Sequence, residues 1–308
     1  MKLICWCLWG CLIGSASALE LREDERVIEV LGADQKLLLR YHKAERPVPD
    51  GVSNDYRRSG YIHPVMTTDG RELTGDFAAD HLHQHGMFFA WTSGKYDGRK
   101  IDFWNQKKVE GRVAHRRVLG KSIRDGKAWF AVELSHFDQR EGGVEILREL
   151  WMVTVHEPEG DHYWFDLESR QRLVGEKPLL IEKYHYGGMA LRGNAVWLGK
   201  GDVCNFLTSA GKTRADSNHT RPDWVAMWGE LGGKPASLVA MGHKNNFRAP
   251  QPVRVHPDKP YFCFAPMVNG AFSIEKGKGF VSRYRFVASG RRASLDWIDP
   301  LWKAYSAE

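Results

Sequence analysis

Apolar residues recur at every second position along most of this chain, and this period constrains the fold more than any other feature. The pattern is typical of β-strands with one buried face, because successive side chains of a strand point to opposite faces. Long amphipathic helical patterns are absent from the sequence. We therefore expect strands at residues 26–30, 36–41, 128–137, 144–155, 161–173, 237–241, 261–265 and 279–288, with one short helix at 299–305.

Turn-forming sequences separate these strands. The chain has 31 glycines and 13 prolines, and clusters such as residues 141–143 and 157–160 are typical of turns. Many short strands joined by turns predict an all-β fold, a large antiparallel β-sandwich. The sequence contains no internal repeat and no linker rich in Pro, Ser or Gly, so we expect a single domain over residues 19–308.

The first 18 residues are typical of a signal peptide. Lys2 supplies a positive charge, residues 3–13 are almost wholly apolar, and residues 16–18 fit a cleavage site. The apolar run is shorter than the roughly 20 residues that span a bilayer. We expect an exported protein, periplasmic or extracellular, without stable membrane insertion. In such an oxidising compartment, Cys204 and Cys263 could form a disulfide or remain two buried thiols, and the sequence does not decide between these alternatives.

The composition bears on the kind of ligand. Twelve tryptophans are many for 308 residues. Surplus aromatic side chains in secreted β-proteins often line sugar-binding grooves, although core packing explains most individual tryptophans. The formal charge is +6, but the basic residues are scattered and form no nucleic-acid motif. We expect a carbohydrate ligand and no nucleic acid, and the positive balance is compatible with an anionic glycan.

The strongest candidate site lies in residues 80–91, which read DHLHQHGMFFAW. In an extended segment His81, His83 and His85 point to one face, directly after a carboxylate. Imidazole transfers protons near neutral pH and is also the commonest metal ligand. The histidines therefore predict a proton-transfer site or a metal site, unless they are satisfied polar groups at a strand edge. No particular cofactor is indicated.

Aromatic residues near this segment are candidate sugar platforms. Trp91 continues the parity of the histidines, which predicts one strand that runs from a polar face into the core. Trp104 lies in residues 102–104, DFW, beside Asp102, a candidate acceptor for sugar hydroxyl groups. The alternative is that the tryptophans belong to the core and that Asp102 shapes a turn.

Three basic residues are further candidates for substrate binding. His115 lies among arginines in residues 112–117, where alternation predicts a basic strand face that suits a carboxylated ligand. Arg148 shares the parity of apolar residues in its strand, so it must be paired or must project into a pocket. Arg192 can donate hydrogen bonds near the end of a second cluster, residues 182–192.

That second cluster reads EKYHYGGMALR. Two adjacent glycines permit sharp backbone geometry, which can bring His185 and Tyr186 toward a ligand. A histidine and a tyrosine side by side can act as an acid–base pair. The alternative is an aromatic-rich turn without chemistry.

Together, these segments resemble a family of secreted bacterial proteins known as PmoA-like, or "methane oxygenase PmoA". The family pattern has proline at position 82 and more often arginine at 85, so the chain's Leu82 and His85 depart from it. The resemblance rests on residues 61–64, 80–86, 89–91, 102–104, 111–115, 186–192 and 224–246.

The resemblance implies a fold more than an activity. It implies the large β-sandwich, or supersandwich, seen in galactose mutarotases and several polysaccharide lyases, and fold alone does not establish function. The membrane subunit whose name the family borrows needs several transmembrane helices, and this sequence shows no such pattern. The family name therefore does not support an oxygenase.

We expect a secreted carbohydrate-active enzyme that uses histidine and tyrosine as acid and base, and lyase, hydrolase and epimerase reactions remain open. The alternatives are a glycan-binding protein without activity and a metal-dependent oxidoreductase at the histidine face. The candidate catalytic residues are His81, His83, His85, His185 and Tyr186. The candidate substrate-binding residues are Trp91, Asp102, Trp104, His115, Arg148 and Arg192.

Overall fold

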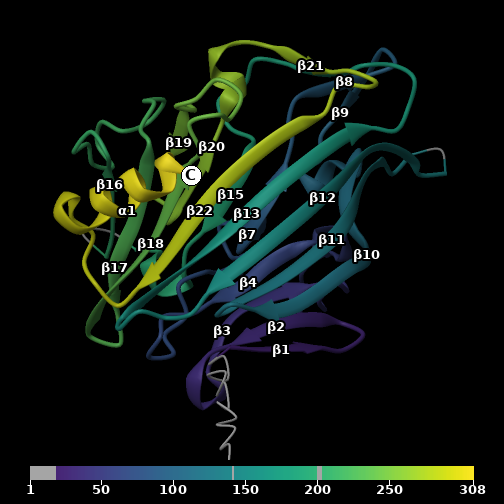
Figure 1. Cartoon of the computed structure of the whole chain (residues 1–308). Helices are drawn as coiled ribbons and strands as arrows, with labels where there is room; N and C mark the ends of the chain where they lie inside the picture. The colour runs from purple at the N-terminus through teal and green to yellow at the C-terminus, as the bar shows by residue number, and fades with distance from the viewer. Residues whose placement is uncertain (1–18, 141, 200–202) are drawn as a thin grey trace, which may run out of the picture.

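The computed structural model describes residues 19–140, 142–199 and 203–308 (Figure 1). The expected signal segment, residues 1–18, lies outside the described residues. Over the described ranges, no helix combines the length and the hydropathy that a membrane span requires.

Two large antiparallel sheets dominate the described part of the chain. The first contains, in spatial order, β1 (Glu20–Glu23), β2 (Val27–Leu31), β3 (Leu37–His42), β4 (Tyr61–Val65), β7 (Met87–Ala90), β15 (Gly188–Arg192), β20 (Tyr261–Phe264) and β19 (Val253–Val255). The second contains β10 (Gly111–Arg124), β11 (Lys127–Asp138), β12 (Val144–His156), β13 (His162–Leu173), β22 (Phe280–Ser289), β18 (Lys234–Gly242), β17 (Trp224–Leu231) and β16 (Cys204–Thr208).

Smaller elements complete the described chain. One small sheet contains β21 (Phe272–Ile274), β14 (Leu179–Ile181), β8 (Gly94–Tyr96) and β9 (Arg99–Ile101), and another contains β5 (Asp76–Ala78) and β6 (His81–His85). The helices are α1 (Leu295–Ala307) and the short 3-10 helices η1 (Ala33–Gln35), η2 (Asn54–Tyr56), η3 (Gln106–Lys108), η4 (Ala195–Trp197) and η5 (Pro266–Asn269).

The inner faces of the two large sheets share one hydrophobic core. Tyr41 of β3 contacts Trp151 of β12, with ring centroids 6.2 Å apart. The hydroxyl of Tyr163 on β13 donates to the backbone oxygen of Leu38 on β3 at 2.6 Å. These contacts join the layers face to face, as a β-sandwich requires.

The C-terminal helix covers part of the outer face of the second sheet (Figure 1). Ile298 and Tyr305 of α1 pack against apolar side chains of β17, β18 and β22. The indole of Trp224 donates to the Asp299 carboxylate at 2.8 Å. Helix α1 begins four residues before the expected helix, since Trp297 and Ile298 extend its apolar face.

The all-β antiparallel sandwich is confirmed, and each strand expected from the alternation is present within a few residues of its expected bounds. The extent of the single domain stays a prediction. Strand β12 shows why the period was informative, since residues 149, 151, 153 and 155 are buried while residues 148, 150, 152 and 154 are not.

One expectation about the strands was wrong. Residues 80–91 do not form a single strand, because the chain turns at Gly86 and divides into β6 and β7 in different sheets. Gly86 has a φ of +48°, and a Cβ there would lie 2.3 Å from the Ile62 backbone oxygen. Only glycine fits this close approach without strain, so the alternation ends at this point.

Candidate functional site

Two adjoining hollows form one cleft beside β6. The hollows have volumes of about 540 and 250 Å³, and both are lined by His81, His83, Asn105 and Tyr186. We call the combined space the histidine cleft. The larger hollow also includes Tyr56, Asp80, Lys107, Lys108 and Tyr184, and the smaller one Trp104, His185, Arg254, His256 and Tyr261.

Five regions that are distant in sequence build the histidine cleft. They are η2, β6 with the residues just before it, the residues around η3, the turn before β15, and the region from β19 to the start of β20. The turn before β15 depends on Gly187 and Gly188, with φ angles of +134° and +93°. A Cβ on Gly188 would lie 2.4 Å from the backbone oxygen of Phe264. The glycine pair therefore allows Tyr186 to reach the cleft directly beside a core strand.

His81 is held in one orientation by a carboxylate. Its Nδ1 lies 2.7 Å from Oδ2 of Asp80. Asp80 in turn accepts two hydrogen bonds from the buried Arg192 guanidinium, at 2.6 and 3.0 Å. Burial by itself raises the pKa of Asp80, but the hydrogen bonds and charges of Arg192 and His81 outweigh it and hold that pKa at about 2.

The hydrogen bond to Asp80 determines what the His81 ring can do. An ionised carboxylate only accepts hydrogen bonds, so Nδ1 of His81 carries the proton in this contact. In the neutral ring, Nε2 then has a free lone pair. Because His81 lines both hollows, this arrangement suits a base that takes a proton from a bound molecule.

His83 lies beside His81 and makes no hydrogen bond with any described residue. The two ring centroids are 5.5 Å apart with the rings nearly perpendicular. Burial, followed by the charges of His81 and His85, lowers the pKa of His83 to about 4. His83 is therefore neutral at pH 7 and lines the cleft as a second imidazole.

Two further histidines complete the cleft. Nδ1 of His256 accepts from the backbone N–H groups of Asp258 and Lys259 at 3.1 and 3.2 Å, so its proton sits on Nε2. Burial and the charge of Arg254 lower the pKa of His256 to about 4. His185 is exposed at the rim, and burial and Arg254 also lower its pKa.

Tyr186 supplies a proton donor. Its hydroxyl is paired with the side-chain amide of Asn105, at 3.0 Å from Nδ2 and 3.2 Å from Oδ1. Its ring centroid lies 5.3 Å from that of the buried Trp104. Burial raises the pKa of Tyr186 well above its usual value, so the phenol stays protonated at neutral pH. A protonated tyrosine and the neutral rings of His83 and His256 therefore share the cleft.

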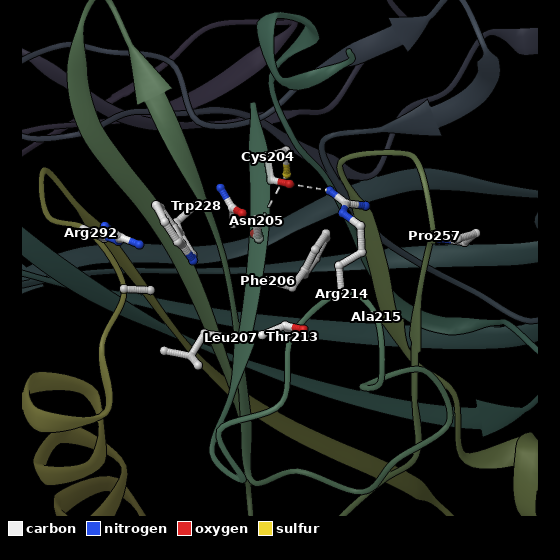
Figure 2. A pocket seen from close by; sticks show the side chains of 11 residues that line it. Cys204, Asn205, Phe206, Leu207, Thr213, Arg214, Ala215, Trp228, Pro257 and Arg292 are labelled. Carbon is white, nitrogen blue, oxygen red and sulfur yellow. Dashed lines mark hydrogen bonds between the residues drawn. The ribbon is translucent and has the colours of Figure 1, made fainter. Parts of the chain in front are cut away.

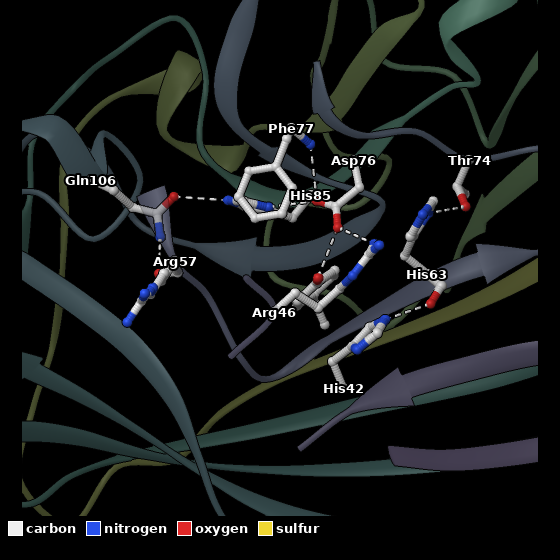
Figure 3. A network of polar contacts seen from close by, with 10 residues as sticks. His42, Arg46, Arg57, His63, Thr74, Asp76, Phe77, His85 and Gln106 are labelled. Carbon is white, nitrogen blue, oxygen red and sulfur yellow. Dashed lines mark hydrogen bonds and ion pairs between the residues drawn. The ribbon is translucent and has the colours of Figure 1, made fainter. Parts of the chain in front are cut away.

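His85 lies outside the cleft, which corrects the expectation that three rings share an open surface. It is fully buried, with Nδ1 2.6 Å from Asp76 and Nε2 2.9 Å from Gln106 (Figure 3). Both ring nitrogens are therefore engaged, and neither is free for a substrate. The strand parity was right for His81 and His83, but β6 descends into the protein before it reaches His85.

The expected sugar platforms and their acid are also corrected. Trp91 is fully buried in the core and donates to Gln171 at 2.6 Å, so it cannot stack on a ligand. Asp102 is buried and accepts from the backbone N–H groups of Trp104 and Asn105, each at 2.9 Å. Asp102 therefore shapes the turn that presents Asn105, which was the alternative expected from the sequence. Trp104 is almost wholly buried but lines the smaller hollow.

None of the three basic candidates lines the histidine cleft. The Nδ1 of His115 is 2.9 Å from the Tyr41 hydroxyl, and His115 does not line the cleft. Arg148 lies on the outer face of β12 and pairs with Glu145 at 2.5 Å. Arg192 is fully buried and binds Asp80, the carboxylate that orients His81.

The prediction that Arg148 shares the buried face of β12 is wrong, because the opposite face of this strand is buried. Glu149, and not Arg148, lies in the core, where it pairs with His136 at 2.6 Å and accepts from the Trp151 indole at 2.7 Å. A buried carboxylate is tolerated because these partners satisfy its oxygens. Such pairing cannot be read from one strand alone.

Neither a disulfide nor a metal-ligand group is found in the ranges that the structure describes. Cys204 and Cys263 are both free and buried. No group of three or more His, Cys, Asp or Glu side chains within residues 19–140, 142–199 and 203–308 is arranged to hold a metal ion. The metal-dependent alternative therefore has no ligand set in the described residues.

The sequence reasoning missed several residues of the cleft. Asn105, Lys107 and Lys108 directly follow the aromatic motif at 102–104, so that motif pointed to the right segment. Arg254 and His256 had no motif, and their only signal was a histidine before a Pro-Asp turn at the end of a strand.

A larger hollow of about 730 Å³ surrounds β16 (Figure 2). Arg214 packs 4.6 Å from the Phe206 ring centroid and donates to the backbone oxygens of Cys204 and His256 at 2.8 and 2.7 Å. It therefore fixes the segment that presents His256 to the cleft. Among the described residues that line this hollow there is no His, Asp or Glu.

Comparison with curated proteins found no match. Among solved structures, the heparan sulfate lyase HepC from Pedobacter heparinus aligns with a TM-score of 0.43 and 9% identity, over 90% of this chain and 37% of that chain. This chain thus spans little more than a third of that lyase. The resemblance to PmoA-like proteins stays a prediction. The family of unknown function DUF6807 matches residues 29–303, most of the sequence, and the chain therefore belongs to the DUF6807 family.

Proposed function

We propose that this protein is an exported carbohydrate-active enzyme and that its histidine cleft performs acid–base chemistry on a glycan or sugar. One observation carries the proposal: a histidine oriented by a carboxylate and a protonated tyrosine line the same cleft. A base and an acid in one cleft are what proton transfer to and from a substrate requires.

His81 is the base in this proposal. Its Nε2 accepts a proton from the substrate, and Asp80 stabilises the imidazolium that forms, as an ionised carboxylate beside a charged ring does. Arg192 is the positioning residue, because its two hydrogen bonds fix the carboxylate. His83 and the Nε2–H group of His256 offer further hydrogen-bonding positions around the bound molecule.

Tyr186 is the acid. Its phenol donates a proton to the oxygen that leaves or is reprotonated, while Asn105 holds the hydroxyl in place. One turnover leaves His81 protonated and Tyr186 ionised, and proton exchange with water at each group restores the starting state. Lyase, hydrolase and epimerase reactions all require proton transfer to or from the substrate, and the choice among them depends on where the substrate lies.

A sugar suits the chemistry of the cleft walls. Aromatic rings of Tyr56, Tyr184 and Tyr186 line it, and aromatic faces pack well against the apolar faces of pyranose rings. Amide and imidazole groups between them provide partners for hydroxyl groups. Small-molecule sites typically combine apolar walls with a few placed polar groups in this way.

The test is turnover by the purified mature protein on a panel of neutral and acidic glycans, followed by reducing-end and ultraviolet assays. We expect Tyr186→Phe and His81→Gln to lower kcat by about 100-fold to 10,000-fold, the usual contribution of a proton-transfer group. The matched control is His162→Ala, which removes a histidine on the outer face of β13. Undiminished turnover in both cleft variants would remove the assigned roles, and binding without product would favour a glycan-binding protein.

A further inference from the structure

The histidine cleft holds positive charge that the proposed proton transfer does not use. Arg254, on β19, lines the smaller hollow, and its side chain makes no hydrogen bond or ion pair with any described residue. Its side chain is half-buried. Lys107, at the larger hollow, is exposed and likewise has no partner among the described residues.

Acidic side chains do not neutralise this charge. Asp80 is the one acidic residue lining the cleft in the described part of the chain, and Arg192 and His81 already pair with it. Asp102, behind the wall, is paired with Lys108 at 2.7 Å. Two cations of the cleft therefore remain without a counter-charge.

Arg254 lines the smaller hollow together with His81, His83, His185 and His256. Burial and, after it, the charge of Arg254 lower the pKa of both His185 and His256. A half-buried guanidinium without a partner is costly to keep, and a bound anion removes that cost. Guanidinium groups match carboxylates in particular, since two parallel N–H groups can bind both oxygens.

We propose that the histidine cleft selects an acidic sugar and that Arg254 binds its carboxylate. This inference rests on the proposed function, because it names the substrate class of the same cleft. The smaller hollow, about 250 Å³, holds the sugar ring whose carboxylate meets Arg254. Lys107, beside the larger hollow, attracts the next acidic residue of the same glycan chain as a point charge.

The test compares uronate oligosaccharides with the same oligosaccharides after carboxyl reduction, and with sulfated neutral galactan oligosaccharides. Binding is measured by calorimetry and turnover by the assays above. The variants are Arg254→Gln and Arg254→Lys. The control is Arg172→Gln, which removes an exposed arginine on the outer face of β13 that has no partner among the described residues.

We expect the wild-type protein to bind the uronate at least about 10-fold more tightly than its carboxyl-reduced form, as a hydrogen bond to a charged group implies. Arg254→Gln abolishes this preference, Arg254→Lys keeps part of it, and Arg172→Gln keeps all of it. Equal binding of both forms by the wild type overturns the inference without any variant. So does a preference that survives in Arg254→Gln, or a stronger preference for the sulfated neutral sugar.

The outcomes separate this inference from the proposed enzymatic function. Uronate binding that depends on Arg254, without any product, supports the acidic-sugar site and contradicts the acid–base enzyme. Turnover of neutral sugars that is unaffected by Arg254→Gln contradicts the acidic-sugar site and leaves the enzyme standing. If no sugar binds, both proposals are wrong.

Discussion

Two groups of histidines lie close together in this protein, and they differ in whether their rings line the histidine cleft or are buried away from it. One group, the sealed network, is formed by His42, His63 and His85 around Asp76 (Figure 3). His42 Nε2 lies 2.7 Å from the His63 backbone oxygen, and His63 Nδ1 lies 3.0 Å from the Thr74 hydroxyl. In the histidine cleft, by contrast, His83 has no hydrogen-bond partner among the described residues, and His81 has one.

This difference separates histidines that hold the fold from histidines that can act on a ligand. His81 and His85 are four residues apart on β6, with the same parity and the same kind of carboxylate partner. Gln106 uses the second nitrogen of His85, whereas the second nitrogen of His81 remains free beside the cleft. Spacing in the sequence therefore predicts that both rings lie on the same side of β6. Their different roles follow only from the residues that contact them.

Asp76→Ala in the sealed network has the largest effect on stability that we expect. The buried carboxylate accepts from Tyr61 at 2.9 Å and pairs with Arg46 and His85, each at 2.6 Å. Its removal leaves buried polar groups without a partner, which costs about 3–5 kcal/mol. Urea unfolding of the variant measures the loss, and a change below about 1 kcal/mol would mean that the network does not stabilise the fold.

Acid weakens the sealed network next. Burial lowers the pKa of His63 to about 4 and that of His42 to about 3, below the 6.5 expected for the unfolded chain. Below about pH 6.5 the unfolded state therefore binds more protons than the folded state. The contribution of these histidines to the free energy of unfolding is complete above about pH 6.5 and is lost as the pH falls toward 4. His63 alone accounts for about 3 kcal/mol of this loss. Melting temperatures from pH 7 to pH 4 measure the trend, and a flat curve would contradict it.

Gly86→Ala tests the turn that separates the cleft strand from the core strand. The positive φ of Gly86 and the close approach of a Cβ to the Ile62 backbone oxygen predict that the variant loses about 2–3 kcal/mol of its free energy of unfolding. The matched control is Gly98→Ala, where φ is +78° but nothing lies within 4 Å, and the expected loss is about 1 kcal/mol. Equal losses in the two variants would show that contact at Gly86 contributes nothing.

The sequence predicted the sandwich well, because strand alternation depends on local burial that each segment records by itself. It also placed His81, His83, His185 and Tyr186 in what proved to be one cleft. It failed where the role depends on a distant partner. Nothing near Arg192 in sequence shows that it binds Asp80, 112 residues away.

The same limit explains the remaining errors. Trp91 belongs to the core through its contact with Gln171 of the second sheet, and Glu149 through its contact with His136 of the neighbouring strand. Arg254 and His256 enter the cleft because β19 lies at the edge of the first sheet, a position that pairing alone determines. Sheet order of this kind arises from long-range contacts, and local periodicity carries no record of it.

The most direct measurement compares His81→Ala and His85→Ala, in one assay of turnover and one of thermal unfolding. We predict that His81→Ala loses at least about 100-fold in turnover with little change in melting temperature, because its free nitrogen serves the substrate. We predict that His85→Ala lowers the melting temperature strongly, because it leaves Asp76 and Gln106 without their partner. The reverse pattern, with stability lost at His81 and turnover intact, would contradict the division between cleft and sealed network.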